Sequence, residues 1–196
     1  MENNRDKLIQ VAAGLFMRYG FHGTSVDDIL DESDVAKSNF YYHFVREDDL
    51  AEAVTDFWVN DYEINLINAS LGDEAIDIWE RLRSLFRHAA ASQNGEEGLI
   101  GCPLARLSSE LANELPQVQR KIDLYFTSLK NRIASLLMTA EGSCLRDEAA
   151  LRVAGTVVTV LEGGLLLSGL RRDGTEVDEP GSTLIDLIQA SQARIF

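Results

Sequence analysis

Residues 24–46, TSVDDILDESDVAKSNFYYHFVR, constrain the fold of this chain more than any other segment. Thr24 or Ser25 is a candidate N-cap for a short helix over residues 26–32, since both side chains can accept a hydrogen bond from the first turn. Ser and Asp then interrupt the pattern, and residues 35–43 form a second short helix. Helices of this length are unstable alone and must pack on neighbours. The segment predicts two short helices joined by a tight turn.

The second of these helices has the composition of a surface that meets a partner. Most of its side chains are polar or aromatic groups that form hydrogen bonds, namely Lys37, Ser38, Asn39, Tyr41, Tyr42 and His43. In a helix-turn-helix domain the second helix lies in the DNA major groove. The pattern therefore favours DNA as the partner, while a three-helix bundle with an exposed, tyrosine-rich end remains open as the alternative.

The periodicity of the whole chain is helical, and strand patterns are nearly absent. We expect an all-α fold with an N-terminal helix-turn-helix domain of three helices (residues 1–46) and a C-terminal domain of six helices (residues 47–196). The expected helices cover residues 4–19, 26–32, 35–43, 47–71, 74–92, a segment from 103, 117–140, 146–170 and 182–195. Gly20 suits the left-handed conformation that often ends a helix.

The acidic composition limits how the chain can bind DNA. The net charge is -14, and residues 1–50 hold five basic side chains against ten acidic ones. A broad basic patch is therefore excluded. Any phosphate contact must use a few local cations, backbone amides and helix N-termini.

The sequence also indicates where the protein works. Two cysteines are too few for a disulfide framework, and the polar N-terminus does not resemble a signal peptide, so we expect a cytoplasmic protein. Residues 153–170 are apolar enough to suggest a membrane span, but Glu162 lies near their middle, where a charge is costly. We expect a buried helix there and no membrane partner.

Residues 12–50 resemble the TetR/AcrR family of transcriptional repressors. The matching residues, in order and spacing, are Leu15-Phe16, Gly20, Thr24-Ser25, Ile29, Val35-Ala36-Lys37 and Tyr41-Tyr42-His43-Phe44. The resemblance implies a DNA-binding regulator. Asp34 departs from the pattern, because a glycine is usual at that turn position, but aspartate tolerates the left-handed region.

The resemblance also implies roles for individual residues. Lys37, Ser38 and Asn39 would face base edges or nearby phosphates. The DNA backbone would be contacted by Tyr41, Tyr42 and His43, by Thr24 or Ser25, and by Arg46. Two alternatives stay open: Tyr42 could pack partly into the bundle, and His43 could only form a hydrogen bond within the turn.

The last two helices are the expected homodimer surface. The helix over residues 146–170 is apolar on nearly every face yet contains Gly155, Gly163, Gly164 and Gly169. Glycine inside a helix costs about 1 kcal/mol relative to alanine, and close approach of another helix would compensate. TetR-like proteins dimerise through a bundle of this kind. A purely intrachain core is the alternative.

An effector site is expected between the C-terminal helices. The candidate ligand-binding residues are Phe57, Trp58, Tyr62, Trp79, Phe86, Cys102, Leu107, Phe126 and Glu162, with Tyr125 as a further candidate. Aromatic residues at helical spacing can instead be core. Residues 101–111, GCPLARLSSEL, resemble a segment of TetR-type regulators that respond to varied apolar or aromatic effectors.

Two polar residues in this set have competing interpretations. Glu162 needs a partner if it is ionised, and this could be a ligand amine or hydroxyl, or an arginine or backbone group across the bundle. Cys102 opens a helix, which favours a thiolate, but a plain buried thiol fits its neighbours better.

Catalysis is not expected. His22, His43 and His88 lack ligand spacing, and GEEGLIG follows no strand as a phosphate loop would. We predict no cofactor and no metal site. The expected function is a homodimeric repressor that binds a palindromic operator in double-stranded DNA and is released by a small, largely apolar or aromatic molecule. An activator, or a helical adaptor that binds protein without DNA, are the alternatives.

Overall fold

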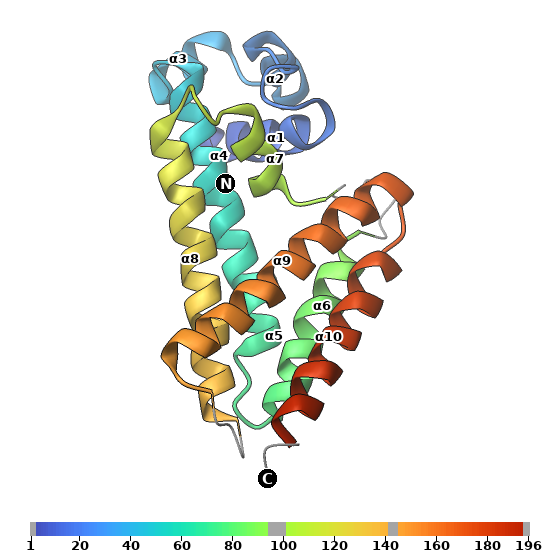
Figure 1. Cartoon of the computed structure of the whole chain (residues 1–196). Helices are drawn as coiled ribbons and strands as arrows, with labels where there is room; N and C mark the ends of the chain where they lie inside the picture. Colours follow the sequence, from blue (N-terminus) through green and yellow to red (C-terminus); the bar gives the residue numbers. More distant parts are fainter. Residues whose placement is uncertain (1–2, 94–100, 141–144, 194–196) are drawn as a thin grey trace. The chain divides into compact units, whose positions relative to one another are not determined.

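The computed structural model describes residues 3–93, 101–140 and 145–193, and every regular element in these ranges is a helix (Figure 1). The elements are α1 (Asn4–Tyr19), α2 (Val26–Ser33), α3 (Lys37–His43), α4 (Glu47–Tyr62), a π-helical segment η1 (Glu63–Asn68), α5 (Ala69–Leu71), α6 (Ile78–Ala91), α7 (Pro103–Glu110), α8 (Pro116–Thr139), α9 (Asp147–Arg171) and α10 (Thr175–Ala193). The all-α prediction is confirmed.

The described chain forms two compact units. The first unit contains residues 3–61 and 103–123, and the second contains residues 62–93, 101–102, 124–140 and 145–193. Residues 103–123, which hold α7 and the start of α8, thus belong to the same unit as α1, α2 and α3. The domain boundary expected between residues 46 and 47 lies inside the first unit. The division into a DNA-binding domain and an effector domain at that point stays a prediction.

α1 has the bounds that its sequence predicts. Asn3 caps it by accepting a hydrogen bond from the Arg5 amide at 3.1 Å. Its apolar stripe is buried, with Leu8 fully inaccessible to solvent. Gly20 ends the helix with φ +83°, and its amide donates to the Phe16 carbonyl.

The turn that joins α2 to α3 also forms as the sequence indicates. Ser25 is the N-cap of α2, because its hydroxyl accepts from the Asp28 amide while the Asp28 carboxylate accepts from the Ser25 amide. Asp34 takes up the left-handed region with φ 52°, so aspartate replaces glycine at that position. Val26, Ile29, Val35 and Phe40 are the buried apolar side chains of α2, the turn and α3.

The long helix expected from residue 47 to residue 71 is present as α4, η1 and α5 in direct succession. The backbone stays right-handed through Tyr62, Asn68 and Ala69, where the three parts join. Counting them as one helix gives the nine helices expected, within the described residues. The π-helical turns were not predicted, because EINLIN contains no glycine or proline to mark them.

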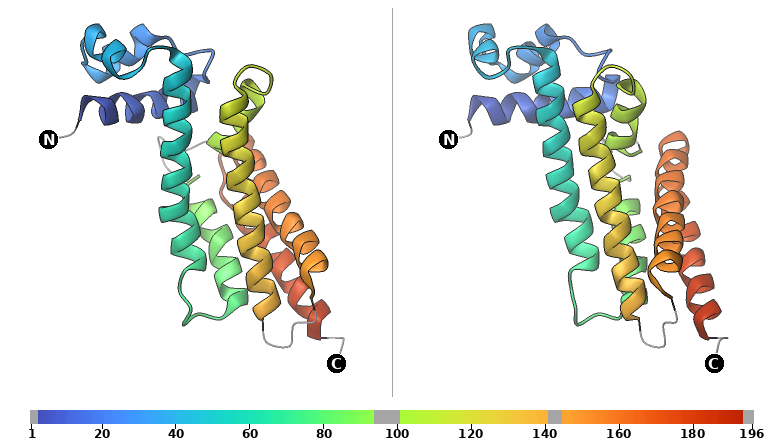
Figure 2. Two further views of the ribbon diagram at one scale, coloured as in Figure 1. Left: turned by 90° about the vertical axis from the view of Figure 1, so that its left-hand side faces the viewer. Right: turned by 60° about the vertical axis from the view of Figure 1, so that its left-hand side comes forward.

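In the second unit, α6, α9 and α10 lie side by side, as Figures 1 and 2 both show. A Cβ atom at Gly164 would come within 2.8 Å of the Glu176 carbonyl oxygen, so α9 and α10 approach closely there. A Cβ atom at Gly181 would overlap the Phe86 ring, so α10 is equally close to α6. Both glycines therefore serve packing within the chain.

Two predicted helix starts were wrong. The helix expected from residue 74 begins at Ile78, because Asp77 accepts from the amides of Trp79 and Glu80, whereas Asp73 accepts only from Ala75 in the preceding turn. The last helix begins at Thr175 instead of residue 182 and contains Pro180. Asp173 caps that earlier start, because its carboxylate accepts from the Thr175 amide.

Candidate nucleic-acid interface and effector site

α3 buries only Phe40 and turns its other side chains outward. Lys37, Ser38, Tyr41 and Tyr42 are exposed, and 83% of the Tyr42 surface is accessible. Asn39 and His43 are partly buried. The alternative that Tyr42 packs into the bundle is therefore wrong, and the short helix presents a polar, aromatic face to solvent.

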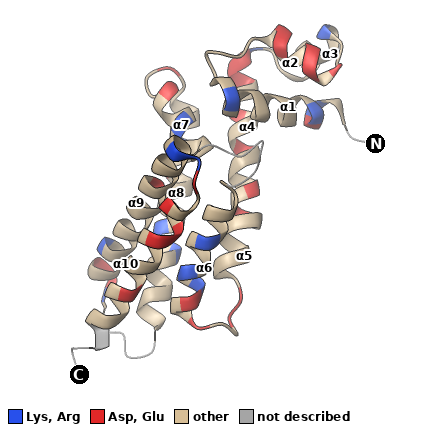
Figure 3. Cartoon of the chain, turned by 90° about the vertical axis from the view of Figure 1, so that its right-hand side faces the viewer, with Lys and Arg blue, Asp and Glu red and all other residues tan. Residues whose placement is uncertain are grey.

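Most cations of the first unit are paired with acidic neighbours, and Figure 3 shows acidic residues mixed with the basic ones. Lys37 Nζ lies 3.1 Å from Asp27 Oδ1, and this contact raises the pKa of the lysine. Arg46 lies 3.4 Å from Asp48 and 3.6 Å from Asp49. These pairs lower the net positive charge that DNA phosphates would meet.

Three other candidate DNA-contacting residues also have local roles. The Thr24 hydroxyl donates to the Gly20 carbonyl at 2.8 Å, and Ser25 is engaged in the capping box of α2. The capping interaction lowers the pKa of the Asp28 carboxyl, since both bonds from Ser25 favour its charged form. Asn39 Oδ1 is buried and has no hydrogen-bond partner among the described residues.

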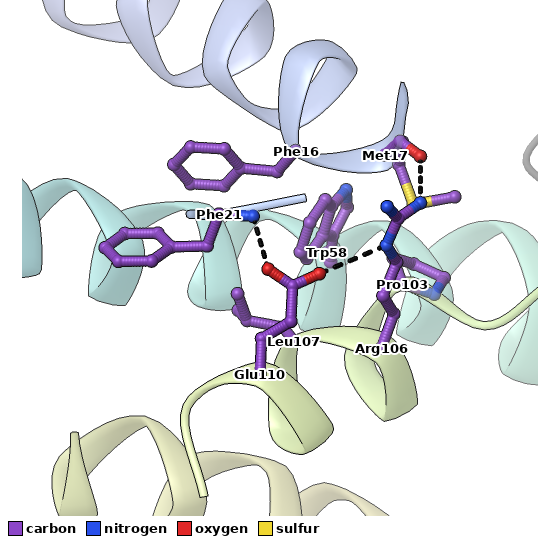
Figure 4. Close-up of a pocket in the computed structure, with 8 residues that line it drawn as sticks. All are labelled: Phe16, Met17, Phe21, Trp58, Pro103, Arg106, Leu107 and Glu110. Carbon is purple, nitrogen blue, oxygen red and sulfur yellow. Dashed lines mark hydrogen bonds and ion pairs between the residues drawn. The ribbon is translucent and has the colours of Figure 1, made fainter. Parts of the chain in front are cut away.

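α7 holds the turn between α1 and α2 from a distant part of the sequence (Figure 4). The Glu110 carboxylate accepts from the Phe21 amide at 2.6 Å and from Arg106 Nε at 3.2 Å. Arg106 also donates to the Met17 carbonyl at 2.6 Å. We call this set the Glu110 clamp. The shallow pocket beside it is lined by Phe16, Met17, Phe21, Trp58, Pro103, Arg106, Leu107 and Glu110.

The Glu110 clamp was missed by the sequence analysis. It joins residues 89 positions apart, and no local pattern marks an arginine and a glutamate one turn apart as partners of a distant loop. Gly20 was the one available signal. Its position leaves room for the carboxylate, because a Cβ atom there would come within 2.6 Å of Glu110 Oε1.

The nine candidate ligand-binding residues do not form one group. Phe57, Trp58 and Leu107 belong to the first unit, and the other six belong to the second. Phe86 is fully buried where α10 crosses it, and Trp79 is 7% exposed, as expected for core side chains. Whether any of them binds a ligand stays a prediction.

Within the second unit, three polar residues gather around Glu162. The Cys102 thiol forms hydrogen bonds with Glu162 and with Tyr62. The rings of Tyr62 and Tyr125 lie 6.1 Å apart, and Tyr125 also contacts the Phe126 ring at 5.2 Å. Burial raises the pKa of both tyrosines and raises the pKa of Glu162 to about 7. We call Tyr62, Cys102, Tyr125 and Glu162 the Glu162 cluster.

α9 is the one helix in the described part of the chain that is long and apolar enough to cross a membrane. Its most apolar stretch is only 33% buried. Leu166, Leu167 and Leu170 are exposed, and a Cβ atom at Gly163 would meet nothing within 4 Å. These four positions follow helical spacing and so share one face of α9, which we call the α9 stripe.

Metal ligation finds no support in the described residues, where no group of three or more His, Cys, Asp or Glu side chains could hold an ion. The polar groups described above are instead spread over a helix face, a loop clamp and a buried cluster. A chain that combines an exposed helix-turn-helix with a larger helical unit has the organisation of the general class of DNA-binding transcriptional regulators.

Comparison with known proteins agrees with this class. Residues 8–54 match the family model described as "Bacterial regulatory proteins, tetR family". Residues 79–181 match the model described as "Transcriptional regulator LmrA/YxaF-like, C-terminal domain". The chain therefore belongs to the TetR family of transcriptional regulators, in which the proteins are DNA-binding regulators and not enzymes.

The relatives have similar lengths and modest identity. The HTH-type transcriptional regulator LmrA of Bacillus subtilis is 25% identical over 190 residues, covering 95% of this chain and 97% of its own. The HTH-type transcriptional repressor DhaR of a Mycobacterium species is 23% identical over 177 residues, covering 89% and 87%. A TetR-family regulator from Streptomyces coelicolor has the same fold, with a TM-score of 0.83 at 19% identity over 97% of this chain and 96% of its own.

Proposed function

We propose that this protein is a homodimeric repressor that binds a palindromic operator through its two α3 helices. In this proposal a small, largely apolar or aromatic molecule bound by the second unit releases the dimer from DNA. The repressor name of DhaR supports the direction of regulation. The observation that carries the proposal is the outward polar face of α3, because a helix that buries one side chain presents the others to a DNA groove.

The DNA contacts follow from exposure along α3 and its flanks. Lys37 and Ser38 at the start of the helix reach base edges or phosphates, with Asn39 beside them. Tyr41, Tyr42 and His43 contact the backbone, together with Thr24 or Ser25 and with Arg46. Lys37 and Arg46 exchange their carboxylate partners for phosphates when DNA binds, which releases counterions and makes the affinity depend on salt.

The α9 stripe supports the homodimer. A soluble protein rarely leaves several leucines of one helix face uncovered, and such a face usually marks a protein–protein contact. Leu166 and Leu170 are 65% and 75% exposed, and Leu187 on α10 is 65% exposed. Gly163 lets a second helix approach the same face. A two-fold interface between copies of α9 and α10 covers these side chains and explains the apolar helix without a membrane, in keeping with a cytoplasmic regulator.

The long helix offers a route from effector to operator. It is continuous from Glu47, next to the helix-turn-helix, to Leu71. We infer that effector binding shifts this helix and so changes the distance between the two α3 helices. In the DNA-bound dimer they should lie about 34–36 Å apart, or a multiple of that, to reach successive major-groove faces.

The proposal is tested by changing the exposed face of α3. Lys37→Ala and Tyr41→Ala should abolish binding to an operator selected from genomic fragments, measured by fluorescence anisotropy, while circular dichroism and dimer mass stay unchanged. Tyr19→Ala, an equally exposed tyrosine on α1, is the control and should bind as the wild type does.

Two results would contradict the proposal. If both α3 variants bind the operator with wild-type affinity, α3 is not the recognition helix. The wild type could also select no DNA fragment and show only weak DNA binding that does not fall with added salt. In that case the protein-binding adaptor becomes the better explanation.

A further inference from the structure

Glu162 is a partly exposed residue whose carboxylate has one buried oxygen with incomplete bonding. Its Oε2 atom is inaccessible to solvent and has no hydrogen-bond partner within the described residues. The Cys102 thiol is the hydrogen-bond donor that meets this side chain. No ion pair joins Glu162 to a described lysine or arginine. The arginines of the second unit that form ion pairs do so with other carboxylates, namely Asp186, Glu80, Glu63, Glu148 and Glu176.

The two tyrosines of the Glu162 cluster add an aromatic wall beside this carboxylate. Tyr62 and Tyr125 are 9% and 7% exposed, and their ring planes are inclined by 48°. Both interact electrostatically with Glu162, and Phe126 extends the wall next to Tyr125. Aromatic faces attract cations because the ring quadrupole is negative above the plane.

The backbone next to the cluster is irregular. Tyr62 is the residue that leads into the π-helical segment Glu63–Asn68, and π-helical turns within α-helices are frequent at functional sites. Cys102 directly precedes α7 and follows Gly101, which has φ +85°. Two of the four cluster residues therefore lie directly next to backbone that departs from α-helical hydrogen bonding.

A single ligand group would complete this site. An organic N–H cation gives Oε2 a donor, gives the carboxylate an opposite charge where water is excluded, and gives the tyrosine rings a cation. A neutral N–H group supplies only the hydrogen bond to Oε2 and neither of the two charge interactions. We propose that the effector is an organic cation, a protonated amine on a flat apolar body, and that Glu162 anchors it between Tyr62 and Tyr125.

This inference rests on the proposed effector response of the second unit. It also predicts that the Glu162 carboxyl group loses its proton when the ligand binds. Burial keeps the pKa of Glu162 at about 7, so near neutral pH the empty site is partly protonated. Binding of a cation displaces that proton, because the ionised carboxylate is then stabilised by the opposite charge. None of the other titratable groups that face the site carries a positive charge; they are Cys102, Tyr62, Tyr125 and, next to Tyr125, Glu63.

The test compares three flat molecules of similar shape that differ in charge and donors. Aminacrine is a cation at pH 8, acridone is neutral with an N–H donor, and acridine is neutral with only an acceptor. Each is titrated into the full-length protein without DNA, and its dissociation constant is measured by fluorescence and calorimetry. The wild type should bind aminacrine at least about tenfold more tightly than either neutral compound, as expected for a desolvated charge pair.

Matched variants assign that preference to one residue. Glu162→Gln keeps the shape of the side chain and should lose the preference for aminacrine. Glu148→Gln removes the same charge from an exposed position on the same helix, with 90% of that side chain accessible, and should bind as the wild type does. Tyr125→Leu should weaken aminacrine binding and leave acridone binding unchanged.

A measurement on the wild type alone covers the case in which Glu162→Gln fails to fold. Calorimetry at pH 7 in two buffers of different ionisation enthalpy should show proton release when aminacrine binds, and none when acridone binds. The proposal is overturned if the wild type binds acridone as tightly as aminacrine, if it binds none of the three compounds, if proton release is absent, or if Glu162→Gln keeps wild-type selectivity.

Operator binding, measured in parallel without any probe, separates this inference from the proposed function. A wild type that binds aminacrine through Glu162 but no DNA would overturn the proposed function and leave the site intact. A wild type that binds its operator but prefers no cation would overturn the site alone.

Discussion

At the scale of single residues, the proposed recognition helix α3 carries a cation that is already paired with an acidic neighbour. Lys37 is 60% exposed, and its ion pair with Asp27 must open before the ammonium group can reach a phosphate. Exposed pairs are weak, so the cost is small, but it applies to both copies of α3 in a dimer.

Asp27→Asn should therefore strengthen operator binding by about two- to fivefold, because the free energy of breaking the pair is removed. Anisotropy at a fixed salt concentration measures the effect. Asp31→Asn is the control, since it removes one negative charge from an exposed position on the same helix. Equal gains from both variants would show that only the overall charge matters.

Glu162 gives stability a pH dependence with a defined sign. Burial raises its pKa from 4.5 to about 7, so the folded protein holds the proton more tightly than the unfolded chain does. The resulting stability is fully present below about pH 4.5 and is lost as the pH rises to about 7.

Glu162→Gln mimics the protonated acid and should remove this loss. Relative to the wild type, its free energy of unfolding should rise between pH 5 and pH 8 by up to about 3 kcal/mol. Urea denaturation at a fixed protein concentration, without ligand, measures this difference. A constant difference between the two proteins across that range would mean that Glu162 is not perturbed by burial.

At the scale of elements, α9 has two faces with different tasks. Gly164 allows α10 to approach within the chain, whereas Gly163 and the leucines of the α9 stripe face solvent. In the sequence the four glycines of α9 share one feature, their unfavourable place inside a helix. In the structure Gly163 and Gly164 face different surroundings, because neighbouring residues on a helix point in different directions.

Leu166→Asp should convert the protein from dimer to monomer and weaken operator binding, because a charge in an apolar interface is costly to bury. Analytical ultracentrifugation gives the mass. Leu124→Asp on α8 is a matched control, as that leucine is 67% exposed, about as much as Leu166. A Leu166→Asp protein that stays dimeric would place the interface elsewhere.

At the scale of the whole molecule, the proposed homodimer brings two DNA-binding units together, because one helix-turn-helix makes too few contacts for tight, specific binding. Scrambling one half of the selected operator should weaken binding at least about a hundredfold, which corresponds to losing several base-pair contacts. The control scrambles the same number of base pairs outside the two halves. Equal affinity for the intact and the half-scrambled operator would contradict a two-fold complex.

Local signals made most of the fold predictable. Asn4–Tyr19, the glycine at position 20 and the left-handed Asp34 follow from apolar spacing and turn chemistry, and the structure confirms them. Competing caps were harder. Asp73 and Asp77 both have the right side chain, and only the packing of Trp79 and the rest of α6 selects the second.

The candidate sites were predictable only where one helix face defines them. The exposed side of α3 could be read from composition, but the lysine–aspartate pairing could not, since it joins two helices. Glu162 is conspicuous in the sequence as a charge in an apolar run, yet its thiol partner is 60 residues away, and no arginine in the described part of the chain forms an ion pair with it. Long-range contacts of this kind depend on the completed fold.

The Glu110 clamp ties the N-terminal helices to α7, which limits how they can be exchanged between proteins. A segment ending at residue 46 is not a transferable DNA-binding module, because the Phe21 amide and the Met17 carbonyl obtain their partners from α7. A chimera that grafts only the N-terminal helices onto a related regulator leaves these groups to whatever the host supplies. In the proposed repressor, operator specificity is therefore encoded by two separated stretches of the gene, one for the N-terminal helices and one for α7. The two must be exchanged together.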